Sequence, residues 1–477
     1  MKKIIILLFC IFLAHSIQAD DDLESLEREF EGNDKTSISQ NKAKYISIQD
    51  AIEIGLRTNL DEKLRVYQFQ LNEIYYQDAF DDFYLPKLQL TMGTTSDHFA
   101  ENLYRDPVTN ASSAKTPTGF IGVGFKDYTL FNWGKDYLDY ANAKNTYYRQ
   151  KEKLSEERRE LRLKVIFEYF NLSRLKNIVT IYKKQLSHTS FVYRLAKEKL
   201  SLKKIKVQEF LQAKAIFLKA HKEFHEANTA YYTAQESLAQ VLGDDPGTVY
   251  VPTDNLKQVP LSINLGEIEK LAVKKNPKIL DARYEVENAV RSHQKTLKEN
   301  LPLPKFSVKL GTYKRLFSDS GYEDNYNTFD DSKNVEIAAT LNMTWTLYGS
   351  GGFLNSRITE SSFYKQRMAE IKMKDSIRES RVSNRLTLSR VQLLEKQFVA
   401  VEAELKNARY VFDKTIDNYI SSKTTFVDLE SVLTELLNSS VNFQNTKFEH
   451  LIEKLNLAKT IGIEDFPGEK FDRMVEK

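Results

Sequence analysis

The sequence lacks the residues for a disulfide framework. Of its 477 residues only one, Cys10, is a cysteine, so the chain must gain its stability from its fold. It also lacks a strong net charge, since 69 basic and 66 acidic residues leave +3. So small a charge gives no field that would attract nucleic acid, and we expect no nucleic-acid partner.

No apolar run is long enough to cross a membrane as a helix, which needs ~20 residues. The run Ile4–Leu13 follows a basic head, Lys2 and Lys3, and precedes a small residue, Ala19, and an acidic stretch. This order predicts a secretory signal peptide over residues 1–19, with an uncleaved anchor as the alternative. An exported chain that spans a membrane without apolar helices must do so with strands.

Glycine and proline are missing from two long tracts of nearly equal length. These tracts lie between Gly134 and Gly243 and between Gly352 and Gly462. In each tract apolar residues are spaced alternately by three and four, from Leu172 onward and again from Val391 onward. A heptad pattern held this long predicts long helices that pack as a left-handed coiled coil. An amphipathic helix on a globular core explains one such run but not two in register.

Shorter motifs recur in the same order along the chain. Leu85-Pro-Lys-Leu88 is matched by Leu303-Pro-Lys-Phe306, and the glycine after Leu242 is matched by the glycine after Ile461. We interpret the sequence as a duplication in which each repeat holds a helix, two strands and a long helical hairpin. The predicted divisions are an N-terminal segment at 20–46, repeats at 47–243 and 265–462, a linker at 244–264 and a frayed C-terminal tail at 463–477.

Four short segments alternate apolar and polar residues with a period of two, which predicts strands with one apolar face. They begin near Leu88, Ile121, Phe306 and Val335, the last reaching Trp345. The connections, at 96–117 and 318–333, are long and polar. Four strands cannot close a barrel, and an open sheet edge in lipid leaves backbone groups unsatisfied. If the sheet lies in a membrane, several identical chains must share one barrel.

Helix lengths predict how the helical part is arranged. From Gly134 to the turn near Ser201 a helix would extend ~100 Å. The return helix to Leu242 covers about half of that length. The predicted helix at 47–84 supplies nearly the same length again. We therefore expect these two shorter helices to lie end to end beside the long one.

Taken in order, these features resemble the TolC-like outer membrane efflux proteins over nearly the whole mature chain. The resemblance rests on the duplicated halves, the helix ends at Asn59 and Asn276-Pro277, the Leu-Pro-x-apolar strand starts and the Leu-Phe/Tyr-x-x-Gly turns. It implies a mainly α fold with a membrane β-barrel: a homotrimer with a twelve-stranded barrel in outer-membrane lipid and a helical tunnel through the periplasm.

The resemblance implies a passive channel without a cofactor or a catalytic site. Such a channel is the exit duct of a tripartite efflux or type I secretion system and works with an inner-membrane pump and a periplasmic adaptor protein. The alternatives are a soluble periplasmic coiled-coil scaffold or adaptor, and a metal-dependent enzyme. The scaffold would explain the helices but not the four strands.

Carboxylates that narrow the periplasmic end of the tunnel are implied at Asp428 and Glu209, because acidic rings in a narrow pore bind cations. Ser431 stands where a second acidic residue is often found. The hairpin tips, where adaptors dock, lack the glycine that the family often carries. The matching tip residues are Ser201, Leu202, Lys203, Lys204, Ser421, Ser422 and Lys423.

One histidine pair has the spacing of a metal site. His221 and His225 share a helix face, with Glu223 between them. The zincin motif places its Glu directly after the first His, so this sequence does not match it. Third-ligand candidates such as Glu226 are ordinary surface residues. We expect no metal site and no enzyme activity.

Overall fold

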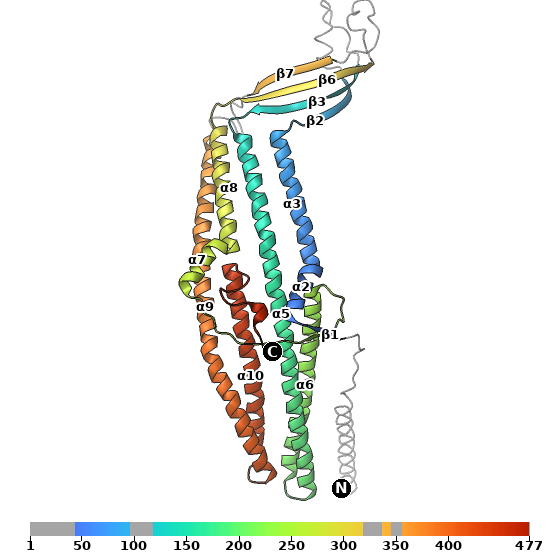
Figure 1. Ribbon diagram of the computed structural model, residues 1–477, viewed down its shortest axis with the longest axis vertical. Helices are drawn as coiled ribbons and strands as arrows, with labels where there is room; N and C mark the ends of the chain where they lie inside the picture. The colour runs from blue at the N-terminus through green and yellow to red at the C-terminus, as the bar shows by residue number, and fades with distance from the viewer. Residues whose placement is uncertain (1–42, 96–117, 318–335, 345–354, 477) are drawn as a thin grey trace, which may run out of the picture.

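The computed structural model describes residues 43–95, 118–317, 336–344 and 355–476. The predicted signal peptide, most of the N-terminal segment, both long loops, Val335 and Trp345 lie outside these residues. Figure 1 shows a long rod of helices with a β-sheet at one end. In the part of the chain that the structure describes, no helix combines the length and the apolar character needed to span a membrane.

Two long helical hairpins run through the rod, as the glycine-free tracts predict. The long helices have 67 and 65 residues, and each return helix has 36. At ~1.5 Å per residue the longer helix extends ~100 Å. The hairpins are α5 (Lys135–Ser201) with α6 (Val207–Leu242), and α9 (Ser356–Ile420) with α10 (Phe426–Ile461).

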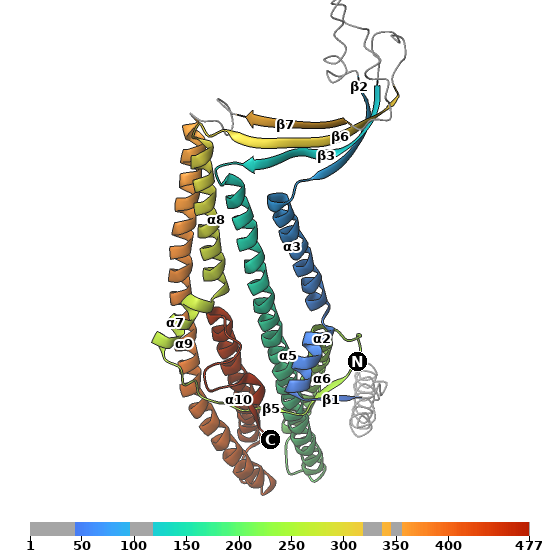
Figure 2. The same ribbon diagram turned by 45° about the horizontal axis from the view of Figure 1, so that its top comes forward.

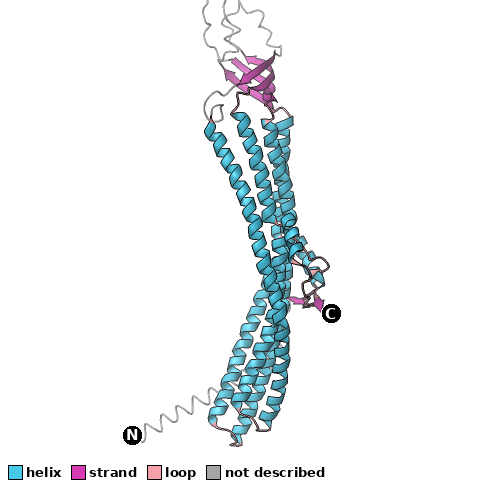
Figure 3. Ribbon diagram, turned by 90° about the vertical axis from the view of Figure 1, so that its left-hand side faces the viewer, coloured by secondary structure: helices cyan, strands magenta, loops and turns pink. Residues whose placement is uncertain are grey.

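Shorter helices extend the two return helices toward the sheet. In Figure 1, α3 continues the line of α6 beside α5, and α8 continues the line of α10 beside α9. Figure 3 shows from the side that helices fill the length of the rod below the sheet. The end-to-end arrangement is therefore confirmed. The single helix expected at 47–84 is in fact two helices, and the second half repeats the break. These helices are α2 (Ile48–Thr58), α3 (Leu60–Tyr84), α7 (Leu265–Lys275) and α8 (Pro277–Glu299).

In the first half an asparagine and a glycine make the junction between the stacked helices. Asn59 caps α3 by accepting the Glu62 N–H at 3.1 Å, and its amide donates to the Val241 carbonyl of α6 at 2.8 Å. Gly243 ends α6 in the left-handed region at φ +76, a conformation that most side chains disfavour. A Cβ on Gly243 would lie 2.7 Å from the Thr58 carbonyl oxygen, so only glycine permits this approach.

The second half makes the same junction with Asn276 and Gly462. Asn276 caps α8 by accepting the Lys278 N–H at 2.8 Å and donates to the Thr460 carbonyl of α10 at 2.6 Å. Gly462 has φ +86, and a Cβ there would lie only 2.0 Å from the Lys275 carbonyl oxygen. The two junctions explain why Asn and Gly recur at matched positions in the sequence.

The helices form a curved layer with two open edges. Near the sheet, α5 packs between α3 and α8, and α8 packs against α9. Farther down, α5 packs between α6 and α10, and α10 packs against α9. The edges of the layer are therefore α3 and α6 on one side and α9 on the other (Figure 1).

The four predicted strands form one antiparallel sheet in the order β2-β3-β6-β7. Pairing of β3 with β6 joins the two halves of the chain, and Figure 2 shows that the sheet is strongly bent. The strands are β2 (Leu88–Thr95), β3 (Thr118–Phe131), β6 (Lys305–Phe317) and β7 (Glu336–Thr344).

Around the middle of the rod, segments expected to be loose are folded onto the helices. Phe466, Phe471 and Met474 are buried in the main core, so the expectation of a frayed C-terminal tail is wrong. Burial of these apolar side chains is favourable even though charged residues lie between them in the sequence. The short elements here are β1 (Lys44–Ile46) parallel to β4 (Tyr250–Pro252), β5 (Asn255–Leu256) antiparallel to β8 (Val475–Glu476), and the 3-10 turn η2 (Phe471–Arg473).

A buried lysine holds the linker and the C-terminal segment together. Lys454 of α10 is fully buried; its ammonium donates to the Val259 carbonyl of the linker at 3.0 Å and pairs with Glu469. Burial lowers the pKa of Lys454, against the opposing effect of Glu469. A buried charge needs such partners, so the lysine fixes the position of both segments.

Candidate functional site

One face of the sheet is apolar and exposed. Leu88, Leu90 and Met92 of β2 are 66%, 64% and 64% exposed. They pair across the sheet with Phe125, Val123 and Ile121 of β3, and facing residues of an antiparallel pair share one face. On the far strand β7, Leu341 and Met343 are also exposed. A sheet in water would bury such a face against a core.

The opposite face is polar and lined with small residues. Gln89 on β2 faces Gly124 on β3, which faces Gly311 on β6. A Cβ on Gly124 would lie 2.5 Å from the Gly311 Cα, so the two backbones approach more closely than side chains would allow. Glycine in strand interiors marks tight bends, so these glycines account for the bend seen in Figure 2.

The outer edge of α3 carries an exposed apolar stripe with coiled-coil spacing. Its members follow each other at intervals of four and three residues, and each is more than half exposed. A stripe with this spacing is the seam that one helix offers to another. The members are Leu60, Leu64, Tyr67, Leu71 and Ile74.

The α9 edge of the layer has apolar side chains at the same height. Tyr364, Met368 and Ile371 are each more than half exposed. Beside them lies a groove between α8 and α9 whose lining includes Ala289 and Ala369. Contacts from helix to helix across the layer show that the α3 stripe and these α9 residues lie at the same height along the rod. These contacts join α3, α5, α8 and α9 in turn: Tyr76 with Tyr140 at 3.1 Å, Asn142 with Ser292 at 3.5 Å, and His293 with Ser362 at 2.8 Å.

The tips of the two hairpins have the same backbone turn. In the first, Lys204 N–H donates to the Lys199 carbonyl at 2.8 Å and Lys203 N–H to the Leu200 carbonyl at 2.9 Å. These two bonds make a Schellman motif, which places Lys203 in the left-handed region at φ +54. The second tip repeats the motif, with Ser422 at φ +57. Glycine usually occupies this position, and neither tip has one.

All seven predicted tip residues are exposed, and three of them are lysines. Lys203 and Lys204 extend from the first tip and Lys423 from the second. Ser201 and Ser421 bond back to helix carbonyls, at 2.7 Å to Glu198 and 2.9 Å to Asp417. The tips therefore present positive charge on rigid turns.

The two candidate pore carboxylates occupy the same place in their helices but have different partners. Each is the third residue of its return helix. Asp428 is exposed and forms a capping box with Thr425, accepting its hydroxyl at 2.6 Å and its N–H at 3.2 Å. Glu209 follows Lys206, which makes no side-chain cap, and instead accepts the Tyr419 hydroxyl at 3.4 Å.

Tyr419 joins the two hairpins near their tips. The Lys199 ammonium of α5 donates to the Tyr419 carbonyl of α9 at 2.8 Å and lies 4.2 Å from the centre of its ring. Burial, with the nearby Glu209 carboxylate, raises the pKa of Tyr419 to about 12. Burial also lowers the pKa of Lys199, although Glu209 opposes this shift. Sequence reasoning placed Tyr419 only in a heptad and missed its contact with Glu209.

Comparison with known proteins agrees with this geometry. Residues 75–244 match the family model of the outer membrane efflux proteins. The predicted resemblance is confirmed. No curated protein matches the sequence.

Solved structures of membrane proteins share the fold of this chain at low sequence identity. A membrane protein from Pseudomonas aeruginosa has a TM-score of 0.72 at 14% identity, covering 87% of this chain and 90% of that one. The outer membrane protein VceC from Vibrio cholerae gives 0.70 at 15%, covering 89% and 96%. The CmeC outer membrane channel from Campylobacter jejuni gives 0.71 at 15%, covering 87% and 85%.

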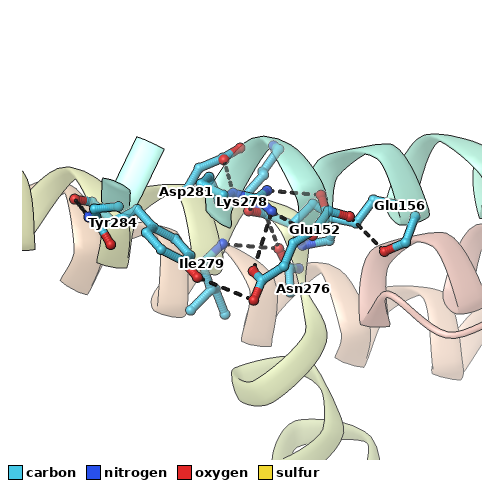
Figure 4. Close-up of polar contacts among 11 residues, drawn as sticks. Glu152, Glu156, Asn276, Lys278, Ile279, Asp281 and Tyr284 are labelled. Carbon is cyan, nitrogen blue, oxygen red and sulfur yellow. Dashed lines mark hydrogen bonds and ion pairs between the residues drawn. The ribbon is translucent and has the colours of Figure 1, made fainter. Parts of the chain in front are cut away.

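An ion network around the buried Arg149 ties the first half of the fold to the second. Arg149 of α5 donates to both oxygens of Glu156, at 2.8 and 3.0 Å, and to Asp281 of α8 at 2.5 Å. Burial opposes the charge, but the bonds to the two carboxylates raise the pKa of Arg149. Figure 4 shows Asp281, Glu152 and Glu156 meeting between the helices. Arg149 is buried and needs its partners, so its bond to Asp281 helps to hold α8 against α5.

Candidate metal ligands do not gather in large groups. Across the residues that the structure describes, no three His, Cys, Asp or Glu side chains stand close enough to hold one ion. His221 and His225 do lie together, with ring centres 4.5 Å apart.

Proposed function

We propose that three copies of this chain form the outer-membrane exit duct of an efflux or type I secretion system. The duct is passive, and an inner-membrane pump supplies the energy. The observation that carries this proposal is the apolar, exposed, bent sheet at one end of a ~100 Å rod of helices. The match to outer membrane efflux proteins supports the same function.

The sheet needs neighbours to close in lipid. Strands β2 and β7 are the edges of the described sheet, and unpaired edge groups cost several kcal/mol each in hydrocarbon. Pairing of β2 with β7 of the next copy would remove both edges. Three copies would supply twelve strands, above the minimum of about eight for a membrane barrel.

The helices offer the same head-to-tail contact below the sheet. The apolar stripe of α3, from Leu60 to Ile74, lies at one edge of the layer, and the groove beside Met368 lies at the other. Their matching heights let the stripe of one copy pack into the groove of the next. Such a heterologous contact closes into a ring, which makes a tunnel below the barrel.

At the far end of the tunnel we propose that Asp428 and Glu209 line the narrow aperture. Carboxylates that ring a poorly hydrated pore attract and bind cations. Glu209 also reaches Tyr419, so an opening movement of one hairpin against the other would break that bond. The exposed lysines Lys203, Lys204 and Lys423 would meet acidic groups of a periplasmic adaptor.

We also propose the domain division drawn from the sequence. It comprises a signal peptide at 1–19, an N-terminal segment at 20–46, repeats at 47–243 and 265–462 with a linker between them, and a C-terminal segment at 463–477. The matching helix lengths and the two Asn–Gly junctions support the repeats.

Single-channel recording in planar bilayers tests the aperture. Asp428→Ala should raise the conductance and weaken block by divalent cations, because one carboxylate per copy is lost. Thr425→Ala is the matched control, since it breaks the capping box but keeps the carboxylate. Unchanged conductance and block in Asp428→Ala would remove this residue from the aperture. The same effect in both variants would assign Asp428 to the helix cap alone.

Cell fractionation separates the duct from its main rival, a soluble periplasmic scaffold. The duct should remain with outer membranes and need detergent for extraction. Release of the chain into the periplasmic fraction without detergent would favour the scaffold, which leaves the exposed apolar face of the sheet unexplained.

A further inference from the structure

The linker between the repeats and the C-terminal segment form one band across the middle of the rod. The band comprises residues 253–263 and 463–476. Its two parts pair as β5 with β8, and the Lys257 N–H donates to the Met474 carbonyl at 2.9 Å. The first hairpin holds the band through α5, where the Tyr169 and Ser173 hydroxyls each donate to Asp254 at 3.0 Å.

The second hairpin holds the band with three side chains. Lys454 of α10 donates to the Val259 carbonyl, and Glu395 of α9 accepts the Leu261 N–H at 2.7 Å. His450 of α10 is buried one helical turn from Lys454, and its Nε2 lies 3.4 Å from the same Glu395 carboxylate. Because a carboxylate only accepts, the neutral imidazole donates to it from Nε2. The band thus links the two hairpins, and a histidine lies under the linker.

The surroundings of His450 keep its imidazole neutral. Burial, aided by the Lys454 ammonium, lowers the pKa of His450, although Glu395 opposes this shift. Glu469 of the band reaches the cluster through its pair with Lys454. Charged groups on the other elements around α10 bond to other residues. They are Arg174 of α5, Arg390 of α9, Glu269 of α7 and Asp465 of the C-terminal segment.

Acid favours the state in which water reaches the His450 ring. The linker passes this ring at Leu261, so lifting the band exposes the imidazole, which then takes up a proton near its ordinary pKa of ~6.5. In the closed state the same proton binds only at lower pH. The open state therefore binds more protons below ~6.5, and its population should rise up to about tenfold by about pH 5.5. Burial raises the pKa of Glu469, an effect of opposite sign, so a substitution must isolate the histidine.

We propose that His450 makes the band an acid-sensitive switch. At neutral pH the band is closed and holds the two hairpins together; in mild acid it opens and lets them move against each other. The switch lies within one chain, so it does not depend on the proposed channel function.

Hydrogen–deuterium exchange of the full-length protein in detergent tests the switch. After correction for the intrinsic effect of pH on amide exchange, opening of the wild-type band should rise up to about tenfold between about pH 7.5 and about pH 5.5. His450→Gln should remove this rise, because the amide can still donate to Glu395 but does not titrate. His188→Gln is the matched control: this histidine stacks on Phe412, nearer the tips, and its loss should leave the response of the band unchanged. No rise in wild type, or an equal rise in His450→Gln, would overturn the proposal.

Labelling of a thiol in the band separates the switch from a folding defect. Met474 is buried in the C-terminal segment, and the native Cys10 lies in the predicted signal peptide, so Met474→Cys introduces a defined thiol. Its rate of reaction with a maleimide, divided by the rate in denatured protein at the same pH, should rise in acid with His450 and stay level with His450→Gln. A folding defect would raise the rate at every pH. The same pH dependence in both backgrounds would contradict the role of His450.

Discussion

The two halves of the chain contain the same elements but differ in how closely those elements pack. Both have a long helix, a return helix of 36 residues and an Asn–Gly junction where a shorter helix continues the line. The second junction is tighter, since a Cβ on Gly462 would lie 2.0 Å from a carbonyl oxygen, against 2.7 Å for Gly243. The tips also differ: only the second return helix has a side-chain cap.

This difference shows which parts of the fold are fixed by backbone geometry. At the junctions, backbone meets backbone, so each half needs the same residue types. At the helix starts, a side chain makes the cap, and a lysine can replace it at a cost of about 1 kcal/mol. Junction changes should therefore destabilise both halves, whereas cap changes should affect the two halves in different ways.

The largest expected effect is at the junction glycines. Gly462→Ala should lower the free energy of unfolding by about 4 kcal/mol, and Gly243→Ala by about 2–3 kcal/mol, since each adds left-handed strain and a backbone clash. Denaturant titration of the detergent-solubilised protein measures both.

Gly247→Ala is the matched control for these glycines. Gly247 has φ +84, but no atom lies within 4 Å of the position that an alanine methyl group would take, so the variant carries the conformational cost without the clash. Its free energy of unfolding should fall by only about 1 kcal/mol. Equal losses at all three positions would show that the clash contributes nothing and that the junctions are not tight.

The junction asparagines should come next in size. Asn59→Ala and Asn276→Ala each remove a helix cap and a bond to the lower helix, for a loss of about 1–2 kcal/mol. The loss in free energy of unfolding should be larger for Asn276→Ala, because the Asn276 amide also donates to the Ser380 hydroxyl at 3.2 Å. The same denaturant titration ranks the two variants by their loss in free energy of unfolding. A larger loss for Asn59→Ala would contradict the proposal that the second junction is packed more tightly than the first.

Most of this fold could be predicted from the sequence because its signals are long or repeated. Glycine-free tracts predicted the hairpins, and period-two alternation predicted the four strands. The junctions at Asn59 and Asn276 were found as motifs, although their role required the contacts to Val241 and Thr460.

The short elements in the middle of the rod escaped the sequence for a physical reason. Strands of two or three residues have no period to detect, and they form only because long-range burial of residues such as Phe471 holds them. At the candidate aperture, Asp428 and Glu209 were assigned from a resemblance. Thr425 lies three residues before Asp428 and is a capping-box partner that a local pattern can indicate, whereas the contact of Glu209 with Tyr419 arises from tertiary packing.

Helix caps give a smaller effect that should differ in sign between the halves. Thr425→Ala should destabilise the second hairpin by about 1 kcal/mol by removing its capping box. Lys206→Thr should stabilise the first by about 0.5–1 kcal/mol, since Glu209 is three residues later and can complete a box. Thermal unfolding followed by circular dichroism measures both; destabilisation by Lys206→Thr would mean that the Glu209–Tyr419 bond matters more than the cap.

The smallest effect concerns pH and a histidine of the first half. His188 of α5 stacks on Phe412, and burial, aided by Lys184, lowers its pKa. The unfolded chain then binds a proton that the folded chain does not, so stability is full above pH ~6.5 and falls below it. His188→Phe should flatten this slope below about pH 6.5. An unchanged slope would show that the histidine does not contribute.

Cross-linking between copies tests the central claim that several chains close one tunnel. The single native thiol, Cys10, lies in the predicted signal peptide, so Leu71→Cys with Met368→Cys introduces a defined pair on opposite edges of the helix layer. A thiol cross-linker should convert the double variant in membranes into a covalent species of three chains. Neither single variant should form this three-chain species. A double variant that yields only single chains would contradict the account.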